Sequence, residues 1–172
     1  ACAASALDEL EQAATLLQQL DLHGLEPLAE LEVLRRLEVA RRRIDHGTDR
    51  FAAHLDVSGA PSVDGLRGAR AALVHLGRLS SAEAGARVRT PRLLSRLPAV
   101  SAAYERGEIP TAHVRAIARV ASNPRVAALL PVADPIFAEQ ASEDGHREFL
   151  RWLRTWEMLA DVDGADNDAA TD

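Results

Sequence analysis

Residues 64–96 read DGLRGARAALVHLGRLSSAEAGARVRTPRLLSR, and this pattern predicts two short helices joined by a sharp turn. Asp64 can cap the first helix, whose apolar residues recur at helical spacing: Leu66, Ala69, Leu73 and Leu76. Gly77 provides the backbone freedom that a sharp turn requires. Ser80 and Glu83 form a capping box, in which the serine hydroxyl accepts the amide of residue 83 and the glutamate reaches back. We therefore expect a helix-turn-helix.

The second helix of this motif allows more than one interpretation. Pro91 cannot donate the backbone hydrogen bond to Arg87, so it should kink or end the helix. Alternatively, Thr90 caps a new helix that has Pro91 at its first position. Two helices joined by a glycine turn also occur in bundles that bind no DNA, so the motif does not by itself establish a DNA-binding site.

Helical spacing continues on both sides of the motif and divides the chain into four predicted segments. We expect an N-terminal helical hairpin at 1–56, a basic helix-turn-helix module at 64–125, C-terminal helices at 126–160 and an acidic linker at 161–172. The composition of residues 57–64 is that of a connecting linker. The apolar stripe expected to face inward in the second hairpin helix consists of Leu37, Ala40, Ile44, Phe51 and Leu55.

The composition favours an all-α helical bundle. Ala, Leu, Arg and Glu are strong helix formers, and aromatic residues make up only 3% of the chain. Pro98 should begin a helix that ends at Gly107, and Pro110 should begin another that ends near Asn123. Trp152 and Trp156 lie one turn apart, and we expect them to pack in the core rather than to stack on bases.

The charges are strongly segregated along the chain. The net charge is −7 in residues 1–34, +9 in residues 35–130 and −8 in residues 131–172, although the whole chain carries only −6. All twenty cationic residues are arginines, which are planar donors suited to phosphates and guanine edges. A cationic segment of this size indicates a polyanionic partner, because each neutralised phosphate releases condensed counterions.

These observations predict a set of DNA contacts. Ser81, Arg87 and Arg89 would contact DNA from the second helix of the motif. Phosphate contacts would come from the arginines around it: Arg78, Arg92, Arg96 and Arg115. A second row, Arg36, Arg43 and Arg50, recurs every seven residues and either contacts DNA or forms a solvated face paired with Glu38 and Asp45.

No catalytic or metal-binding set can be assembled from the sequence. Cys2 is a single cysteine, which excludes an internal disulfide and a Cys-based zinc site. The six histidines are scattered, and His46 with Asp49 is expected to be a solvated surface pair rather than a ligand pair. No orienting carboxylate accompanies Ser80 and Ser81, and no Gly-rich phosphate loop is present. We expect no cofactor, no small-molecule substrate and no membrane span.

The middle of the chain resembles the helix-turn-helix core of ParB/KorB-type DNA-binding proteins. The matching residues are LGRLSSAEAGARVR at 76–89, followed by LPAV, ERGEI and AHVRAIA. This resemblance covers about 50 residues and implies a groove-reading helix at roughly 80–90. The nucleotide-binding segment of ParB is not seen, so no nucleotide switch is implied.

A closer resemblance extends over nearly the whole chain. It is similar to the N-terminal domain of unknown function in the actinobacterial 13E12-repeat family, which commonly precedes an HNH endonuclease domain. The matching stretches are HLDVSGA at 54–60, LSSAEAGARVR at 79–89, LPAVSAAYERGEIPTAHVRAIARV at 97–120 and FLRWLRTWEMLADVDGADND at 149–168. Pro110 departs from the small polar residue expected there, and the chain stops where the nuclease would begin.

Together, these features predict a non-catalytic DNA-binding or targeting domain, which resembles the N-terminal part of an HNH endonuclease-like protein. The chain itself would not be an enzyme, whereas a longer parent could be one. Double-stranded DNA is the expected partner, and the Leu-rich helices could form a homodimer. The alternative is a protein-interaction module without DNA binding. We expect a cytoplasmic, nucleoid-associated protein, and because the chain begins with Ala1 we expect it to be a fragment of a longer one.

Overall fold

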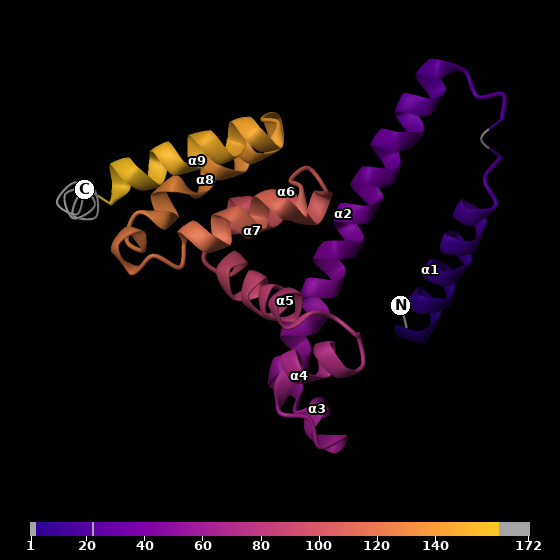
Figure 1. The fold of residues 1–172 in the computed structure, drawn as a ribbon, viewed down its shortest axis with the longest axis horizontal. Coiled ribbons are helices and arrows are strands. Elements are labelled where there is room, and N and C mark those ends of the chain that lie inside the picture. Colours follow the sequence, from indigo (N-terminus) through magenta and orange to yellow (C-terminus); the bar gives the residue numbers. More distant parts are fainter. Residues whose placement is uncertain (1–2, 22, 162–172) are drawn as a thin grey trace. The chain divides into compact units, whose positions relative to one another are not determined.

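The computed structural model describes residues 3–21 and 23–161 of the chain, and these residues form helices and no strand. The elements are α1 (Ala3–Gln18), α2 (Pro27–Ser58), α3 (Ala60–Val63), α4 (Gly68–His75), α5 (Ser81–Leu94), α6 (Pro98–Arg106), α7 (Thr111–Val120), the 3-10 helix η1 (Pro124–Val126), α8 (Leu130–Glu143) and α9 (His146–Ala160). Figure 1 shows their order along the chain. The predicted all-α class is confirmed. Apart from Asp161, the predicted acidic linker lies outside the described residues.

The chain divides into two compact units, Ala1–Arg36 and Leu37–Asp172. The first contains α1 and the beginning of α2, and no residue of α1 is buried. The second contains the rest of α2 and all later helices, and it holds the hydrophobic core. The candidate site described below lies entirely within the second unit.

The part of α2 in the second unit buries a different face from the one predicted. Ile44 and Phe51 of the predicted inner stripe are 42% and 61% exposed, whereas His46, Asp49 and Ala52 are buried. The prediction was wrong because these polar side chains face Tyr104 of α6. The His46 ring meets the Tyr104 ring edge-on, with centroids 5.2 Å apart.

The turn between α4 and α5 keeps the predicted serine cap and differs in detail. The Ser80 hydroxyl accepts a hydrogen bond from the Glu83 amide at 3.1 Å, as the capping box requires. The left-handed residue is Arg78, with φ 53°, and not Gly77. Gly77 is needed for a steric reason, because a Cβ there would lie 2.7 Å from the Leu73 carbonyl oxygen.

Helix α4 begins later than predicted, and α5 continues further. Arg67 and not Asp64 precedes α4, which buries Ala69 and Ala72, while Leu76 stays 65% exposed. Helix α5 continues through Pro91 to Leu94 because Leu93 and Leu94 pack into the core. Packing therefore outweighs the hydrogen bond that the proline cannot donate. The segment predicted as a linker contains the short helix α3.

The core of the second unit is built by α6 to α9 together with the end of α5. Helix α6 begins at Pro98 and ends before Gly107, as predicted. Helix α7 begins just after Pro110 and ends at Val120, three residues before the predicted end near Asn123. Gly107 has φ 78°, and a Cβ there would lie 2.8 Å from the Val39 carbonyl oxygen, so α2 passes very close to this turn. Trp152 and Trp156 pack against Phe137, which confirms that they belong to the core.

Candidate functional site

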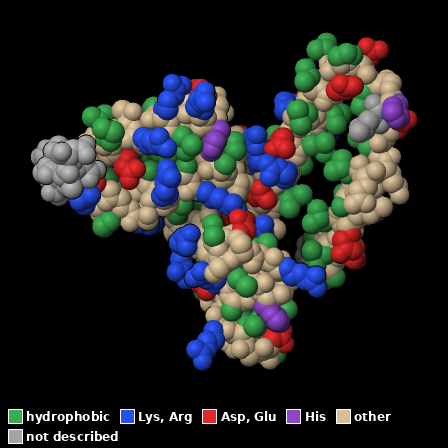
Figure 2. Space-filling view, viewed as in Figure 1, with side chains coloured by type: hydrophobic (Ala, Val, Ile, Leu, Met, Phe, Trp, Pro, Cys, Tyr) green, Lys and Arg blue, Asp and Glu red, His purple; other side chains and the backbone are tan. Residues whose placement is uncertain are grey.

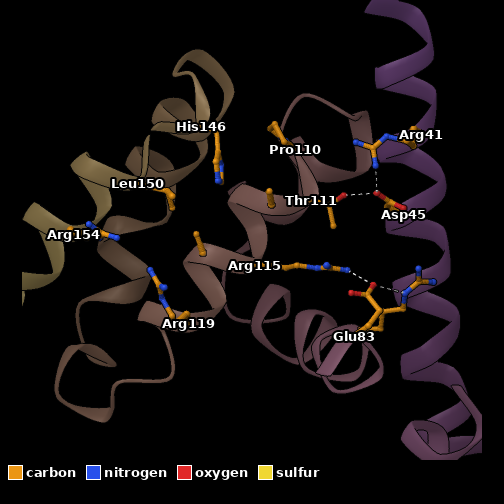
Figure 3. A pocket seen from close by; sticks show the side chains of 13 residues that line it. Arg41, Asp45, Glu83, Pro110, Thr111, Arg115, Arg119, His146, Leu150 and Arg154 are labelled. Carbon is orange, nitrogen blue, oxygen red and sulfur yellow. Dashed lines mark hydrogen bonds and ion pairs between the residues drawn. The ribbon is translucent and has the colours of Figure 1, made fainter. Parts of the chain in front are cut away.

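An arginine-lined groove crosses the second unit between α2, α5, α7 and α9. Its volume is about 660 Å³, and Figure 3 shows the side chains that line it. Five of them are arginines and two are carboxylates: Arg41, Arg87, Arg115, Arg119, Arg154, Asp45 and Glu83. On the face shown in Figure 2, cationic side chains gather over α5, α7 and α9. Within the groove, arginines therefore clearly outnumber acids.

Both carboxylates of the groove are engaged by neighbouring residues. Glu83 accepts hydrogen bonds on the same oxygen, Oε1, from Arg115 Nη2 at 2.5 Å and from Arg87 Nε at 3.2 Å. The hydrogen bond from Arg115 is the largest cause of a lowered pKa for the Glu83 carboxyl. Asp45 accepts a hydrogen bond from the Thr111 hydroxyl at 2.6 Å and pairs with Arg41 at 3.6 Å. Glu83 thus holds two groove arginines in fixed positions.

Arg119 on α7 and Arg154 on α9 are different, because they form no ion pair with any residue in the described part of the chain. Both side chains are exposed and line the groove. Figure 3 shows their guanidinium ends turned toward one another across the space between the two helices. Two like charges facing each other without a counterion make this end of the groove attractive to an anion.

The predicted contact residues divide into two groups. Arg87 and Arg115 lie together in the groove, and Arg89 lines an adjoining cavity of about 380 Å³ with Arg115 and Arg119. The remaining four lie elsewhere: Arg78 in the α4–α5 turn, Ser81 at the start of α5, Arg92 on α5 and Arg96 just after it.

Three of these four make contacts within the protein. The Ser81 hydroxyl accepts a hydrogen bond from Arg70 at 2.6 Å. Arg92 forms an ion pair with Asp56 near the end of α2, and Arg96 donates to the Ala127 carbonyl at 3.3 Å. The structure therefore does not gather the predicted set on one face of α5.

The groove also contains basic residues that were not predicted as contacts: Arg41, Arg119, His146 and Arg154. A signal for some of them was available. Arg115 and Arg119 are four residues apart on α7, and His146, Leu150 and Arg154 recur every four residues on α9. Such spacing places each set on one face of its helix. The sequence does not indicate that the two faces oppose each other.

A buried polar cluster lies next to the groove. Tyr104 Oη is 3.4 Å from Asp49 Oδ2 and 3.3 Å from Thr111 Oγ1, and the threonine in turn contacts Asp45. Burial raises the pKa of the Asp49 carboxyl to about 6, against the opposing effects of Arg87 and Arg115. Burial also raises the pKa of Tyr104 and lowers that of His46. The prediction of a solvated His46–Asp49 pair was wrong, since both side chains are buried.

In residues 3–21 and 23–161, no three His, Cys, Asp or Glu side chains are grouped so that they could hold a metal ion. No helix in the same ranges is both long and apolar enough to cross a membrane.

Comparison with known proteins identifies a family but gives no activity. Residues 31–166, well over half of the chain, match the family described as "Domain of unknown function (DUF222)". No curated protein and no solved structure matches the chain. Nothing in these comparisons supports the resemblance to ParB/KorB-type proteins, whereas the match agrees with the wider resemblance to an N-terminal domain of unknown function. The chain therefore belongs to the DUF222 family.

Proposed function

We propose that this chain is a non-catalytic DNA-binding domain, and that its groove contacts the phosphates. The observation that carries the proposal is the pair Arg119 and Arg154, which face each other without an acidic partner among the described residues. Phosphates are the anions that guanidinium groups bind best, since one phosphate can accept two parallel hydrogen bonds from one guanidinium group. The proposal covers duplex and single-stranded DNA, because both present the same phosphates.

Two neighbouring features support this proposal. Glu83 already orients Arg87 and Arg115, so these side chains lose little conformational freedom when a phosphate arrives. The adjoining cavity places Arg89 beside Arg115 and Arg119, which extends the cationic surface from α9 across α7 to α5. We also propose, from the 13E12-repeat resemblance, that such a domain serves to target an HNH endonuclease-like protein to DNA.

The decisive variant is the double substitution R119Q/R154Q. We expect it to weaken binding of a labelled mixed-sequence DNA, tested as a duplex and as one of its strands, by about tenfold. The plot of log affinity against log salt should become shallower by roughly 1.4 to 1.8, since two phosphate contacts are lost. Fluorescence anisotropy at several salt concentrations measures both quantities.

R147Q/R151Q is the matched control for this experiment. Both residues are exposed on α9, neither lines the groove, and their replacement removes the same charge. We expect less than a twofold change in affinity. An equal loss of DNA affinity in the two double variants would show a general charge effect and would contradict the groove proposal. Unchanged DNA affinity of R119Q/R154Q would contradict it as well.

A protein-interaction module is the second candidate, and the first unit gives a specific reason for it. The leucines of α1 and of the first turns of α2 are largely exposed: Leu7, Leu10, Leu16, Leu17, Leu28, Leu31 and Leu34. Apolar faces of this kind are often covered by a partner, here by a second copy in a homodimer. Sedimentation at two salt concentrations separates the candidates. Salt-dependent self-association without DNA binding would favour the interaction module.

A further inference from the structure

A column of four rings runs from the core of the second unit to the groove. The Trp152 and Phe149 ring centroids are 6.1 Å apart, and Phe149 and His113 stack at 4.4 Å. His113 and His146 then stack at 5.3 Å with only 11° between their planes. Phe149 and His113 are buried, whereas His146, the last ring, is exposed and lines the groove.

The support beneath the exposed ring is rigid. His113 Nδ1 lies 2.9 Å from the Ala141 carbonyl oxygen, which fixes the orientation of this imidazole. Burial lowers the pKa of His113, so an uncharged ring lies under His146 at neutral pH. Figure 3 shows the His146 side chain pointing from the beginning of α9 into the groove. The groove therefore contains one flat aromatic surface among its arginines.

We propose that His146 stacks on an unpaired base and that the groove binds a single-stranded segment of DNA. This inference rests on the proposed function and specifies the form of DNA that the same site takes. A ring beside guanidinium groups is the arrangement by which proteins hold single strands, with bases on aromatic faces and phosphates on arginines. Leu150 lies one turn after His146 in the groove wall and adds an apolar contact for a base.

Duplex DNA fits this arrangement poorly. Each internal base of a duplex is covered on both faces by its neighbours, so its ring becomes available only after unstacking, which costs a few kcal/mol. The groove arginines can still contact duplex phosphates, but the His146 ring then has no free base face to stack on. We therefore expect a single strand to bind more tightly than a duplex of the same length.

The test compares labelled oligothymidylate with an abasic oligonucleotide of equal length, which has the same phosphates and no bases. H146A should weaken oligothymidylate binding by at least about fivefold and leave abasic binding unchanged, since one stacking contact between a base and an aromatic ring contributes at least about 1 kcal/mol. H146F, which restores a ring without any charge, should recover the affinity for oligothymidylate. Circular dichroism of each variant checks that the helix content of the chain is unchanged.

The possible failures of the two proposals are distinguishable. If H146A weakens both oligonucleotides equally, or weakens neither, the stacking inference is overturned while the arginine groove stands. Failure of H146F to recover binding would also overturn it. If neither oligonucleotide binds the wild-type chain, or if R119Q/R154Q leaves both affinities unchanged, the proposed function itself fails.

Discussion

Replacing Asp134 with alanine is expected to lower the free energy of unfolding by about 3 kcal/mol. Asp134 lies on α8, is only 3% exposed, and accepts hydrogen bonds from the first free amides of α6. Its Oδ2 lies 2.7 Å from the Ala99 nitrogen and its Oδ1 lies 3.0 Å from the Val100 nitrogen. These amides have no partner within their own helix, so alanine would leave two donors unsatisfied, at roughly 1 to 3 kcal/mol each when buried.

Urea unfolding followed by tryptophan fluorescence measures this effect, because Trp152 and Trp156 pack against Phe137 of the same helix α8. E139A is the matched control, since Glu139 is an exposed acid on α8, and we expect it to change stability by less than about 0.5 kcal/mol. D134N keeps one acceptor oxygen, so its free energy of unfolding should lie between those of D134A and E139A. A D134A protein within 1 kcal/mol of wild type would show that water or a backbone shift satisfies these amides.

Much of the local structure follows from short-range sequence signals. Ser80 caps α5, Pro98 begins α6 and Gly107 ends it, all as predicted. Each of these signals acts within one helical turn and needs no knowledge of the rest of the chain. The all-α class likewise follows from composition, because Ala, Leu and Arg favour helices over strands.

The failures that affect the core and the groove concern long-range pairing. Asp49 is buried because it meets Tyr104, 55 residues away, so a polar face of α2 turns inward. The Glu83 side chain was expected to reach back to the Ser80 amide, but it accepts a hydrogen bond from Arg115, 32 residues later. Helical spacing could place the groove arginines on faces of single helices. It could not show that those faces oppose each other, since that depends on how α7 and α9 pack.

The second large effect is expected at Asp49. Burial raises the pKa of its carboxyl from 3.8 to about 6. The folded protein therefore binds more protons than the unfolded chain between these two values, and stability declines as the pH rises through this window. D49N should match wild type near pH 4 and exceed its free energy of unfolding by roughly 2 to 3 kcal/mol at pH 8, since asparagine is uncharged throughout.

The hydrogen-bond geometry can also accommodate the protonated carboxyl. A protonated Asp49 can donate to the Tyr104 oxygen, the tyrosine can then donate to Thr111, and Thr111 donates to Asp45, so each hydroxyl has one acceptor. An asparagine NH₂ group can take the place of the protonated carboxyl. Ionised Asp49 would instead accept the single tyrosine proton, and this hydrogen bond favours the ionised form, so burial is the cause that raises the pKa of Asp49.

Urea unfolding of D49N and wild type at pH 4, 5, 6 and 8 tests this expectation, with D64N as the control at an exposed aspartate. His46 is also buried nearby, and burial lowers its pKa, so its own effect on stability appears as the pH falls. Because His46 is present in both proteins, its effect largely cancels in the difference between them. A D49N protein less stable than wild type at pH 8 would mean that Arg87 and Arg115 hold Asp49 ionised, and the groove arginines would then be neutralised by a third carboxylate.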